Sequence, residues 1–246
     1  MAPQTETRHN GEVGSEIGSW RNSTRIFLQP IAAPSILGLF GFAGATFMVA
    51  AHQAEWFGNA QSPTFIFPFA AMFGGLAQLL AGMWAYKARD GIATAAHGTW
   101  GAFWLGYGIL NLLIATGDIT APTGGKFVEL GYWFLPLAVI TASIAVAALA
   151  ESVGLFGVLS TLAVGSAFSA IGFLTSGTTW EQVGGWVLLG SAALAWYVAT
   201  ALLLTGAWGR TVLPLGKFER RANVPGMRPT FPIEFELGEP GVKQGQ

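Results

Sequence analysis

Six long apolar segments follow one another along this chain, with short polar stretches between them. They span residues 34–53, 64–86, 92–116, 131–150, 152–174 and 182–208. None of the six contains Lys, Arg, Asp or Glu. An α-helix of about 20 residues crosses the ~30 Å hydrocarbon core of a bilayer, and each segment reaches that length. The pattern therefore predicts an all-α integral membrane protein with six transmembrane helices.

Two polar tails flank this region. Residues 1–33 carry charges of both signs and lack the short apolar run near Met1 that a cleavable signal peptide would have. Residues 209–246 combine several prolines with alternating charges, which is typical of a flexible extension. We expect residues 34–208 to form one transmembrane domain, with both tails outside the bilayer.

The composition agrees with a membrane location. Hydrophobic residues make up 52% of the chain and charged residues only 10%, whereas about 25% of the residues in soluble domains are charged. The chain has no cysteine, which excludes disulfides and thiolate metal sites. We expect the lipid bilayer as its surroundings and no nucleic-acid partner.

The basic residues are distributed asymmetrically among the polar stretches. Eleven of the twelve lie in the two tails or between the second and third segments, and Lys126 is the exception. Because six spans place both tails on the same side, these eleven residues share one side of the membrane. Lys and Arg are retained on the cytoplasmic side. We therefore expect both termini in the cytoplasm of a multi-pass protein of the inner (plasma) membrane.

Few polar side chains lie inside the apolar segments, and Gln78 and His97 are the most informative of them. A Ser or Thr hydroxyl can bond to a carbonyl of its own helix, whereas these two side chains cannot be satisfied so locally. An ionisable residue within a membrane segment is a candidate functional residue. The other reading of His97 is a neutral imidazole that donates one hydrogen bond between helices.

Several kinds of chemistry are excluded by what the segments lack. No lysine lies in the middle of a segment to form a retinal Schiff base, and no segment has two histidines to ligate haem or a metal. GxSxG, HExxH and P-loop motifs are also missing. We expect no enzymatic activity, no cofactor and no metal site. A neutral, aromatic-rich interior with scattered amides and hydroxyls suits a pathway for a small solute.

Four stretches resemble blocks of the acetate uptake transporter family, the succinate–acetate permeases, and they occur in the family's order. They are AAPSILGLFGFAGATF (32–47), FGGLAQLLAGMWAYKARD (73–90), HGTWGAFWL (97–105) and GRTVLPLG (209–216). The first resembles the NPAPLGL signature, with Ser35 and Ile36 as an insertion. The second and third are similar to the GG-x-AQ-x-x-AG and SYGSFW blocks, and the fourth to the family's closing block.

This resemblance implies a funnel-like bundle of six helices that assembles as a homo-hexamer. Each protomer would have its own pathway for acetate or a similar small carboxylate, narrowed by an apolar constriction. On the matching positions the constriction is Phe42, Trp100 and Leu162, with Trp100 in place of the family's Tyr. Ala195 matches a position associated with substrate size, and we group it with Tyr197 as a substrate-binding candidate.

The charge of a carboxylate sets the requirements for such a pathway. A bare carboxylate costs many kcal/mol to desolvate, and the segments offer no buried cation. Gln78, Thr94 and Thr99 can donate neutral hydrogen bonds and are substrate-binding candidates. If the acid instead crosses with a proton, His97 is the proton-coupling candidate, because histidine is the side chain that ordinarily titrates near neutral pH.

The prediction is therefore transport of acetate, succinate or propionate, with proton coupling as the preferred mechanism. Two alternatives remain open. One is a passive channel for acetate or another small solute such as ammonia, and the other is a non-transporting membrane sensor. The short polar stretches leave little room for a signalling domain, which disfavours the sensor.

Overall fold

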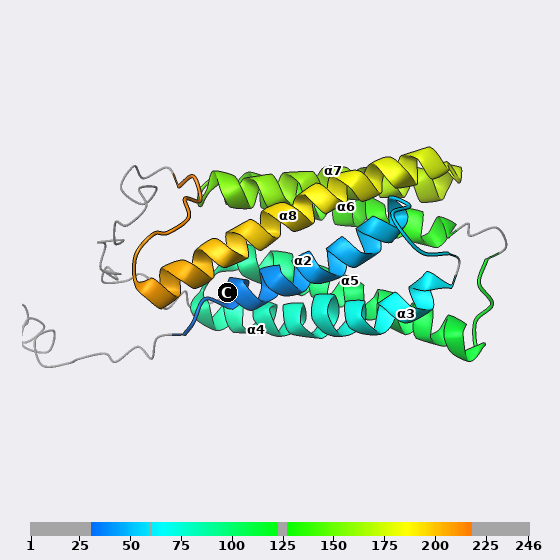
Figure 1. Ribbon diagram of the computed structural model, residues 1–246, viewed down its shortest axis with the longest axis horizontal. Coiled ribbons are helices and arrows are strands. Elements are labelled where there is room, and N and C mark those ends of the chain that lie inside the picture. The colour runs from blue at the N-terminus through cyan, green and yellow to red at the C-terminus, as the bar shows by residue number, and fades with distance from the viewer. Residues whose placement is uncertain (1–30, 60, 123–126, 218–246) are drawn as a thin grey trace, which may run out of the picture. The chain divides into compact units, whose positions relative to one another are not determined.

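The computed structural model describes residues 31–59, 61–122 and 127–217, and the regular elements in this part of the chain are all helices (Figure 1). They are α2 (Pro34–Gln53), α3 (Ser62–Phe69), the π-helix η1 (Ala70–Ala77), α4 (Gln78–Ala88), α5 (Gly91–Thr116), α6 (Val128–Ala148), α7 (Val153–Thr175) and α8 (Thr178–Trp208). α3, η1 and α4 follow without a break, so Ser62–Ala88 forms one span of 27 residues. The six predicted segments are confirmed as six helices long and apolar enough to cross a membrane.

Local sequence explains where these helices begin. Asp90 caps α5 by accepting a hydrogen bond from the backbone N–H of Ala93 (2.8 Å). Ser152 caps α7 in the same way, through the N–H of Leu155 (3.2 Å). α8 begins at Thr178 rather than at residue 182, so its first turn includes Glu181, where a negative charge is favourable.

The middle of the second span is a π-helix. Pro68, inside α3, has no backbone N–H to donate to the preceding turn, and η1 begins shortly after it at Ala70. A π-turn fits an extra residue into a helix and is frequent at functional sites. Here it ends where Gln78 begins α4, and Gln78 is buried.

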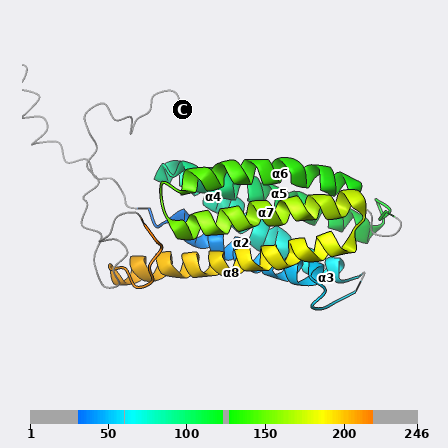
Figure 2. The ribbon, with the colours of Figure 1, turned by 90° about the horizontal axis from the view of Figure 1, so that it is seen from above.

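The helices from α2 to α8 form a bundle in which they lie side by side along a common direction (Figures 1 and 2). The packing order is α6, α7, α8 and α2, after which α2 packs on η1 and α4, and these pack on α5. α5 and α6 meet over a less extensive contact. This contact, which we call the α5–α6 seam, closes the ring of helices.

Backbones approach closely where α4 packs on α5. A Cβ on Gly82 would lie 2.8 Å from the backbone nitrogen of Gly98, and a Cβ on Gly101 would lie 2.6 Å from that of Leu79. Such distances are too short for any side chain, so glycine is required at both positions. Small residues of this kind let membrane helices gain dispersion contacts along their backbones.

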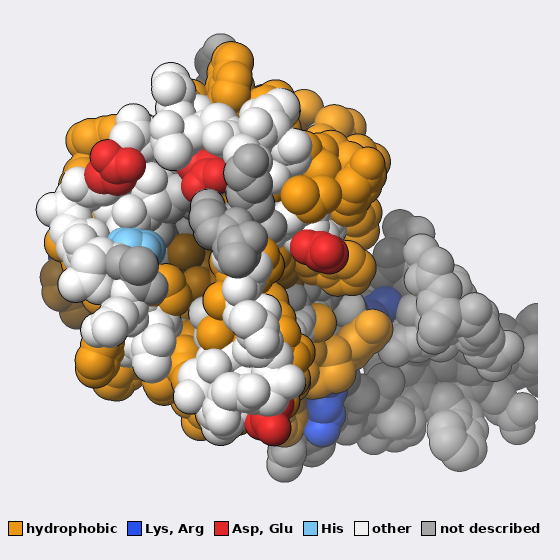
Figure 3. All heavy atoms as spheres, turned by 90° about the vertical axis from the view of Figure 1, so that its right-hand side faces the viewer, with side chains coloured by type: hydrophobic (Ala, Val, Ile, Leu, Met, Phe, Trp, Pro, Cys, Tyr) orange, Lys and Arg blue, Asp and Glu red, His pale blue; other side chains and the backbone are white. Residues whose placement is uncertain are grey.

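The outside of the bundle is apolar. Large hydrophobic side chains that are more than half exposed include Phe65, Phe69, Tyr132, Val139 and Trp196. Figure 3 looks onto the end of the bundle where α7 leads into α8, and it shows acidic side chains on that end with hydrophobic ones around its rim. This distribution suits helices surrounded by lipid, with one end in water.

Candidate solute pathway

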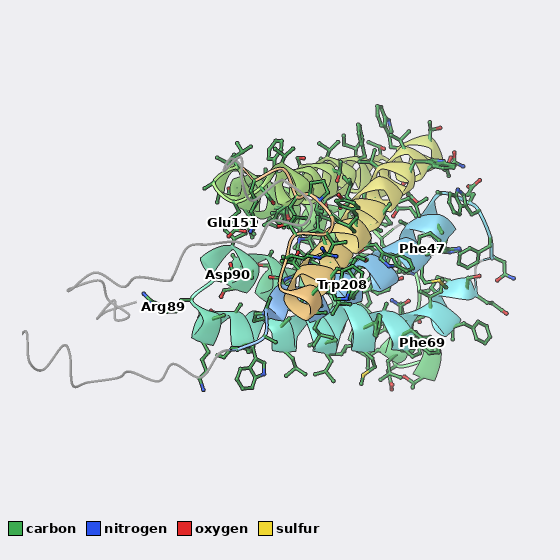
Figure 4. All side chains as sticks on the ribbon, turned by 60° about the vertical axis from the view of Figure 1, so that its left-hand side comes forward. Phe47, Phe69, Arg89, Asp90, Glu151 and Trp208 are labelled. Atoms are coloured by element: carbon green, nitrogen blue, oxygen red, sulfur yellow. The ribbon has the colours of Figure 1, made fainter. Side chains whose placement is uncertain are left out.

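A cavity of about 290 Å³ enters the bundle between α2, α4, α5, α7 and α8. Its outer part is lined by Ser35, Asp90 and Glu151, which lie at or near the ends of helices. Figure 4 shows Asp90 and Glu151 at the same end of the bundle as Arg89. We call this the Asp90 end. The cavity runs from it toward the middle of the helices.

Three apolar side chains meet at the inner part of this cavity. Phe42 comes from α2, Trp100 from α5 and Leu162 from α7, and all three line the cavity. Each is only 2% exposed, and they belong to one hydrophobic cluster. The rings of Phe42 and Trp100 meet edge to face, with centroids 6.3 Å apart. The positions that sequence resemblance assigned to a constriction thus lie together in space.

The Trp100 ring is held by a hydrogen bond that sequence reasoning missed. Its indole N–H donates to the hydroxyl of Thr141 on α6 over 3.0 Å. That hydroxyl donates in turn to the carbonyl of Leu137 at 2.6 Å. A threonine hydroxyl in an apolar segment ordinarily bonds to a carbonyl of its own helix. The position of Thr141 in the sequence therefore gave no sign of a second hydrogen-bond partner. The signal available was Trp100 itself, since a buried indole N–H needs an acceptor.

Two polar side chains line the cavity beside these apolar residues. Gln78 and His97 are buried, at 2% and 3% exposed. Oε1 of Gln78 and Nδ1 of His97 have no hydrogen-bond partner within the described part of the chain. Leaving a buried polar atom unpaired is unfavourable. Oε1 of Gln78 can therefore accept a hydrogen bond from something that enters the cavity, and Nδ1 of His97 can accept or donate one according to its tautomer.

Comparison with known proteins places this chain in a family. Residues 21–218 match the GPR1/FUN34/yaaH family. The chain belongs to this family. The succinate-acetate/proton symporter SatP of Escherichia coli is 31% identical over 188 residues, which cover 76% of this chain and 96% of that protein. Ammonia transport outward protein 2 of Saccharomyces cerevisiae is 30% identical over 183 residues, covering 72% of this chain and 64% of that protein.

The fold agrees with the family match. The structure of the bacterial acetate channel SatP superposes with a TM-score of 0.70 at 30% identity, covering 76% of this chain and 100% of that one. The resemblance to the acetate uptake transporter family is therefore confirmed. The chain is a multi-pass membrane protein of a plasma-membrane transporter family, and this family is not one of enzymes.

The family match continues past α8 into a segment that packs back on the bundle. The carbonyl oxygens of Leu215 and Gly216 accept hydrogen bonds from the N–H groups of Gly154 (2.9 Å) and Val153 (3.1 Å), at the start of α7. We call residues 211–217 the C-terminal strap. Its Leu215 and Lys217 line the cavity. The rest of the predicted C-terminal tail, from residue 218, lies outside the described residues, as do residues 1–30 of the N-terminal tail.

The mouth of the cavity is charged. Asp90, Glu151 and Lys217 all line it. Desolvation raises the pKa of Glu151, the charge of Asp90 raises it further, and Lys217 opposes the shift. Hydropathy could not single out these residues, because they lie in short connections or beyond the last span, where charges are ordinary.

Four of the candidate residues lie away from the cavity lining. Thr94 donates its hydroxyl to the carbonyl of Asp90 (2.8 Å), and Thr99 is partly buried outside the lining. Ala195 is fully buried in the hydrophobic core. Tyr197 is 39% exposed, and its hydroxyl donates to the carbonyl of Pro214 in the strap (2.7 Å).

Proposed function

We propose that this protein carries acetate and related short-chain carboxylates, such as succinate and propionate, across the plasma membrane in company with a proton. The solute enters the cavity at the Asp90 end and crosses between Phe42, Trp100 and Leu162. Each protomer of a homo-hexamer has its own pathway. The relatives named as a succinate-acetate/proton symporter and an acetate channel support this assignment.

The observation that carries the proposal is the pair of buried, unpartnered polar atoms beside an apolar constriction. The Gln78 amide offers both a donor and an acceptor. An uncharged carboxylic acid has the complementary pair, a hydroxyl that donates and a carbonyl that accepts. Gln78 can therefore hold the neutral acid by two hydrogen bonds, without a buried cation and without the cost of desolvating a carboxylate.

His97 is our candidate for proton coupling. It lies one helical turn before Trp100 on α5, so its ring borders the constriction on the cavity side. Its unpartnered Nδ1 can carry the proton that converts an entering carboxylate to the neutral acid, and can take that proton back as the solute leaves. Histidine is suited to this role because small changes of environment move its charge across the physiological pH range.

The constriction serves as a dry barrier in this proposal. Phe42, Trp100 and Leu162 present no polar atom to the passage apart from the indole N–H, which Thr141 already binds. Water and inorganic ions find no hydrogen-bonding partner there, and an apolar constriction of this kind stays dewetted. A small organic acid crosses more readily, because its alkyl part contacts apolar side chains favourably.

We place the Asp90 end on the cytoplasmic side. Lys87, Arg89, Arg210 and Lys217 all lie near the helix ends at or beside this mouth. Basic residues next to membrane spans are retained in the cytoplasm. This orientation puts both chain termini in the cytoplasm and opens the cavity to the cell interior.

A passive pathway for ammonia is the second candidate. The relative named ammonia transport outward protein 2 supports it, and a neutral solute of that size also needs only a dry constriction with a few hydrogen-bonding atoms. The two candidates predict different results in a competition experiment. If the pathway takes carboxylic acids, acetate and propionate compete with each other for it. If the pathway takes only ammonia, neither acid slows ammonia transport.

Uptake by reconstituted protein tests the proposal. Full-length protein in liposomes should take up labelled acetate faster than empty liposomes, and an inward proton gradient at zero voltage should accelerate it. His97→Gln should abolish the response to the gradient. His52→Gln is the matched control, because His52 bonds to the Phe57 carbonyl near a helix end and does not line the cavity.

The outcomes separate the possible mechanisms. Uptake no faster than in empty liposomes would rule out carboxylate transport. Rapid uptake that ignores the proton gradient would establish a channel in place of a symporter. A response to the gradient that survives His97→Gln would remove His97 from the coupling.

A further inference from the structure

The α5–α6 seam closes the ring of helices, and one hydrogen bond across it ends on the constriction. It joins the Trp100 indole N–H of α5 to the Thr141 hydroxyl of α6. Phe103 and Phe134 meet across the same seam, with ring centroids 5.3 Å apart. Trp100 is 2% exposed and Thr141 is fully buried. The seam therefore fixes the position of a ring that borders the passage.

The Thr141 hydroxyl has little freedom of its own. It donates to the Leu137 carbonyl one turn back on α6, which leaves its lone pairs to accept the indole N–H of Trp100. Threonine is also stiff about χ1, because its Cβ carries two heavy atoms. An oxygen held in this way sets the direction in which the indole N–H must point, and so sets the rotation of the whole ring.

An indole ring needs such an acceptor because it can donate a hydrogen bond but cannot accept one. Trp104, one helical turn further along α5, provides the contrast. Its Nε1 is buried and has no partner in the described ranges. Without the Thr141 hydroxyl, Trp100 would be in the same position, and its ring would gain by turning toward another acceptor. Rotation of a ring at the constriction changes the width of the passage.

We propose that Thr141 is a positioning residue that sets the size limit of the pathway by fixing the rotation of Trp100. Thr141 is not among the cavity-lining residues, so it acts through Trp100 rather than by touching the solute. The inference rests on the proposed function, because a size limit has meaning only for a pathway that conducts.

Three variants of the full-length protein test this role. Thr141→Val removes the hydroxyl and keeps the branched shape, and Thr141→Ser keeps the hydroxyl. Thr161→Val is the matched control, since among the described residues the Thr161 hydroxyl bonds only to carbonyls of its own helix, and Thr161 lies outside the cavity lining. Each protein is reconstituted in liposomes, and the uptake of acetate and of butyrate is measured separately.

The measured quantity is the ratio of butyrate uptake to acetate uptake. Thr141→Val should raise it about three- to tenfold, the range expected from the loss of one buried hydrogen bond. Thr141→Ser should keep the wild-type ratio to within about twofold, and Thr161→Val should not change it. In a Trp100→Phe background Thr141→Val should have no further effect, because Phe has no N–H to hold.

A second readout does not depend on transport. In protein with isotope-labelled tryptophan, the indole N–H signal of Trp100 can be assigned by its loss in Trp100→Phe. Thr141→Val should shift this signal and speed its exchange with solvent, whereas Thr161→Val should do neither. A signal that stays unchanged in Thr141→Val would overturn the inference, since the hydrogen bond would then not orient the ring.

The transport outcomes are equally decisive. A shifted Trp100 signal with an unchanged uptake ratio would overturn the inference and leave the proposed function intact. The same conclusion would follow if Thr141→Val changed the uptake ratio just as much in the Trp100→Phe background. Wild-type acetate uptake no faster than in empty liposomes would instead overturn the proposed function, and this inference with it.

Discussion

Gly38 lies directly against the imidazole ring of His97. A Cβ added to Gly38 would lie 2.5 Å from Cε1 and 2.6 Å from both ring nitrogens. Gly38 is in the first turns of α2 and His97 in those of α5. The position of the only histidine that lines the cavity within the described residues is therefore set by the missing side chain of a glycine on another helix.

Gly38→Ala should displace His97 and reduce proton-coupled uptake. Overpacking of this kind costs about 1–3 kcal/mol, and the ring is the part that can move. We expect acetate uptake under an inward proton gradient to fall about tenfold or more. Gly106→Ala is the control, because no described residue outside its own helix backbone lies within 4 Å of a Cβ added there. Equal uptake by the two variants would show that the ring position does not matter.

Leu162→Ala should widen the constriction. The side chain is buried in the same hydrophobic cluster as Phe42 and Trp100 and lines the same cavity, so its loss opens space there. Longer acids should then compete with acetate uptake, and the protein should lose about 2–5 kcal/mol of stability. Leu203→Ala is the control, because the Leu203 side chain is 44% exposed on the outer surface of the bundle. Competition by longer acids in both variants alike would argue against a gate at Leu162.

Gln78→Leu and Gln53→Leu should have opposite consequences. Gln78 has an unpartnered buried oxygen. Gln78→Leu should therefore weaken competition by acetate for uptake about tenfold and leave the melting temperature near the wild-type value. Gln53 donates to the Ser169 hydroxyl and the Glu181 carbonyl, both at 2.9 Å. Gln53→Leu should lower the melting temperature and leave competition by acetate for uptake unchanged. Thermal melting in detergent and acetate competition in liposomes measure the two effects, and a large stability loss in Gln78→Leu would contradict the assignment.

Glu151→Gln should stabilise the protein near neutral pH. Desolvation, followed by the charge of Asp90, raises the pKa of Glu151 above its ordinary 4.5, against the pull of Lys217. A carboxyl with a raised pKa binds its proton more tightly in the folded protein, so its charged form costs stability. This cost is absent well below pH 4.5 and complete above the folded pKa. Melting temperatures of variant and wild type should therefore differ at neutral pH and converge in acid.

The six spans could be predicted from the sequence because hydropathy reports directly on which segments a bilayer accepts. The π-helix in the second span could not be. Apolar residues such as Ala70 and Ala77 partition into lipid equally well whichever carbonyl each N–H bonds to. Only Pro68, which has no backbone N–H to donate, indicated a change in the backbone hydrogen bonding of this span.

The grouping of three apolar side chains at the cavity was predictable for a different reason. Phe42, Trp100 and Leu162 occupy positions that sequence resemblance marks one by one, and resemblance needs no knowledge of packing. Thr141 and Tyr197 are the opposite case. Their roles depend on which partner lies opposite their hydroxyl groups, and that is decided by helix packing and by the fold of the strap. Sequence spacing alone carries no such information.

The C-terminal strap is the last part of the described chain to be synthesised, yet its Leu215 and Lys217 line the same cavity as Ser35 near the start of the first span. A nascent chain can therefore hold all six spans in the bilayer while the mouth of the cavity is still incomplete. A fusion partner joined directly to Trp208 would keep the bundle and leave that entrance incomplete.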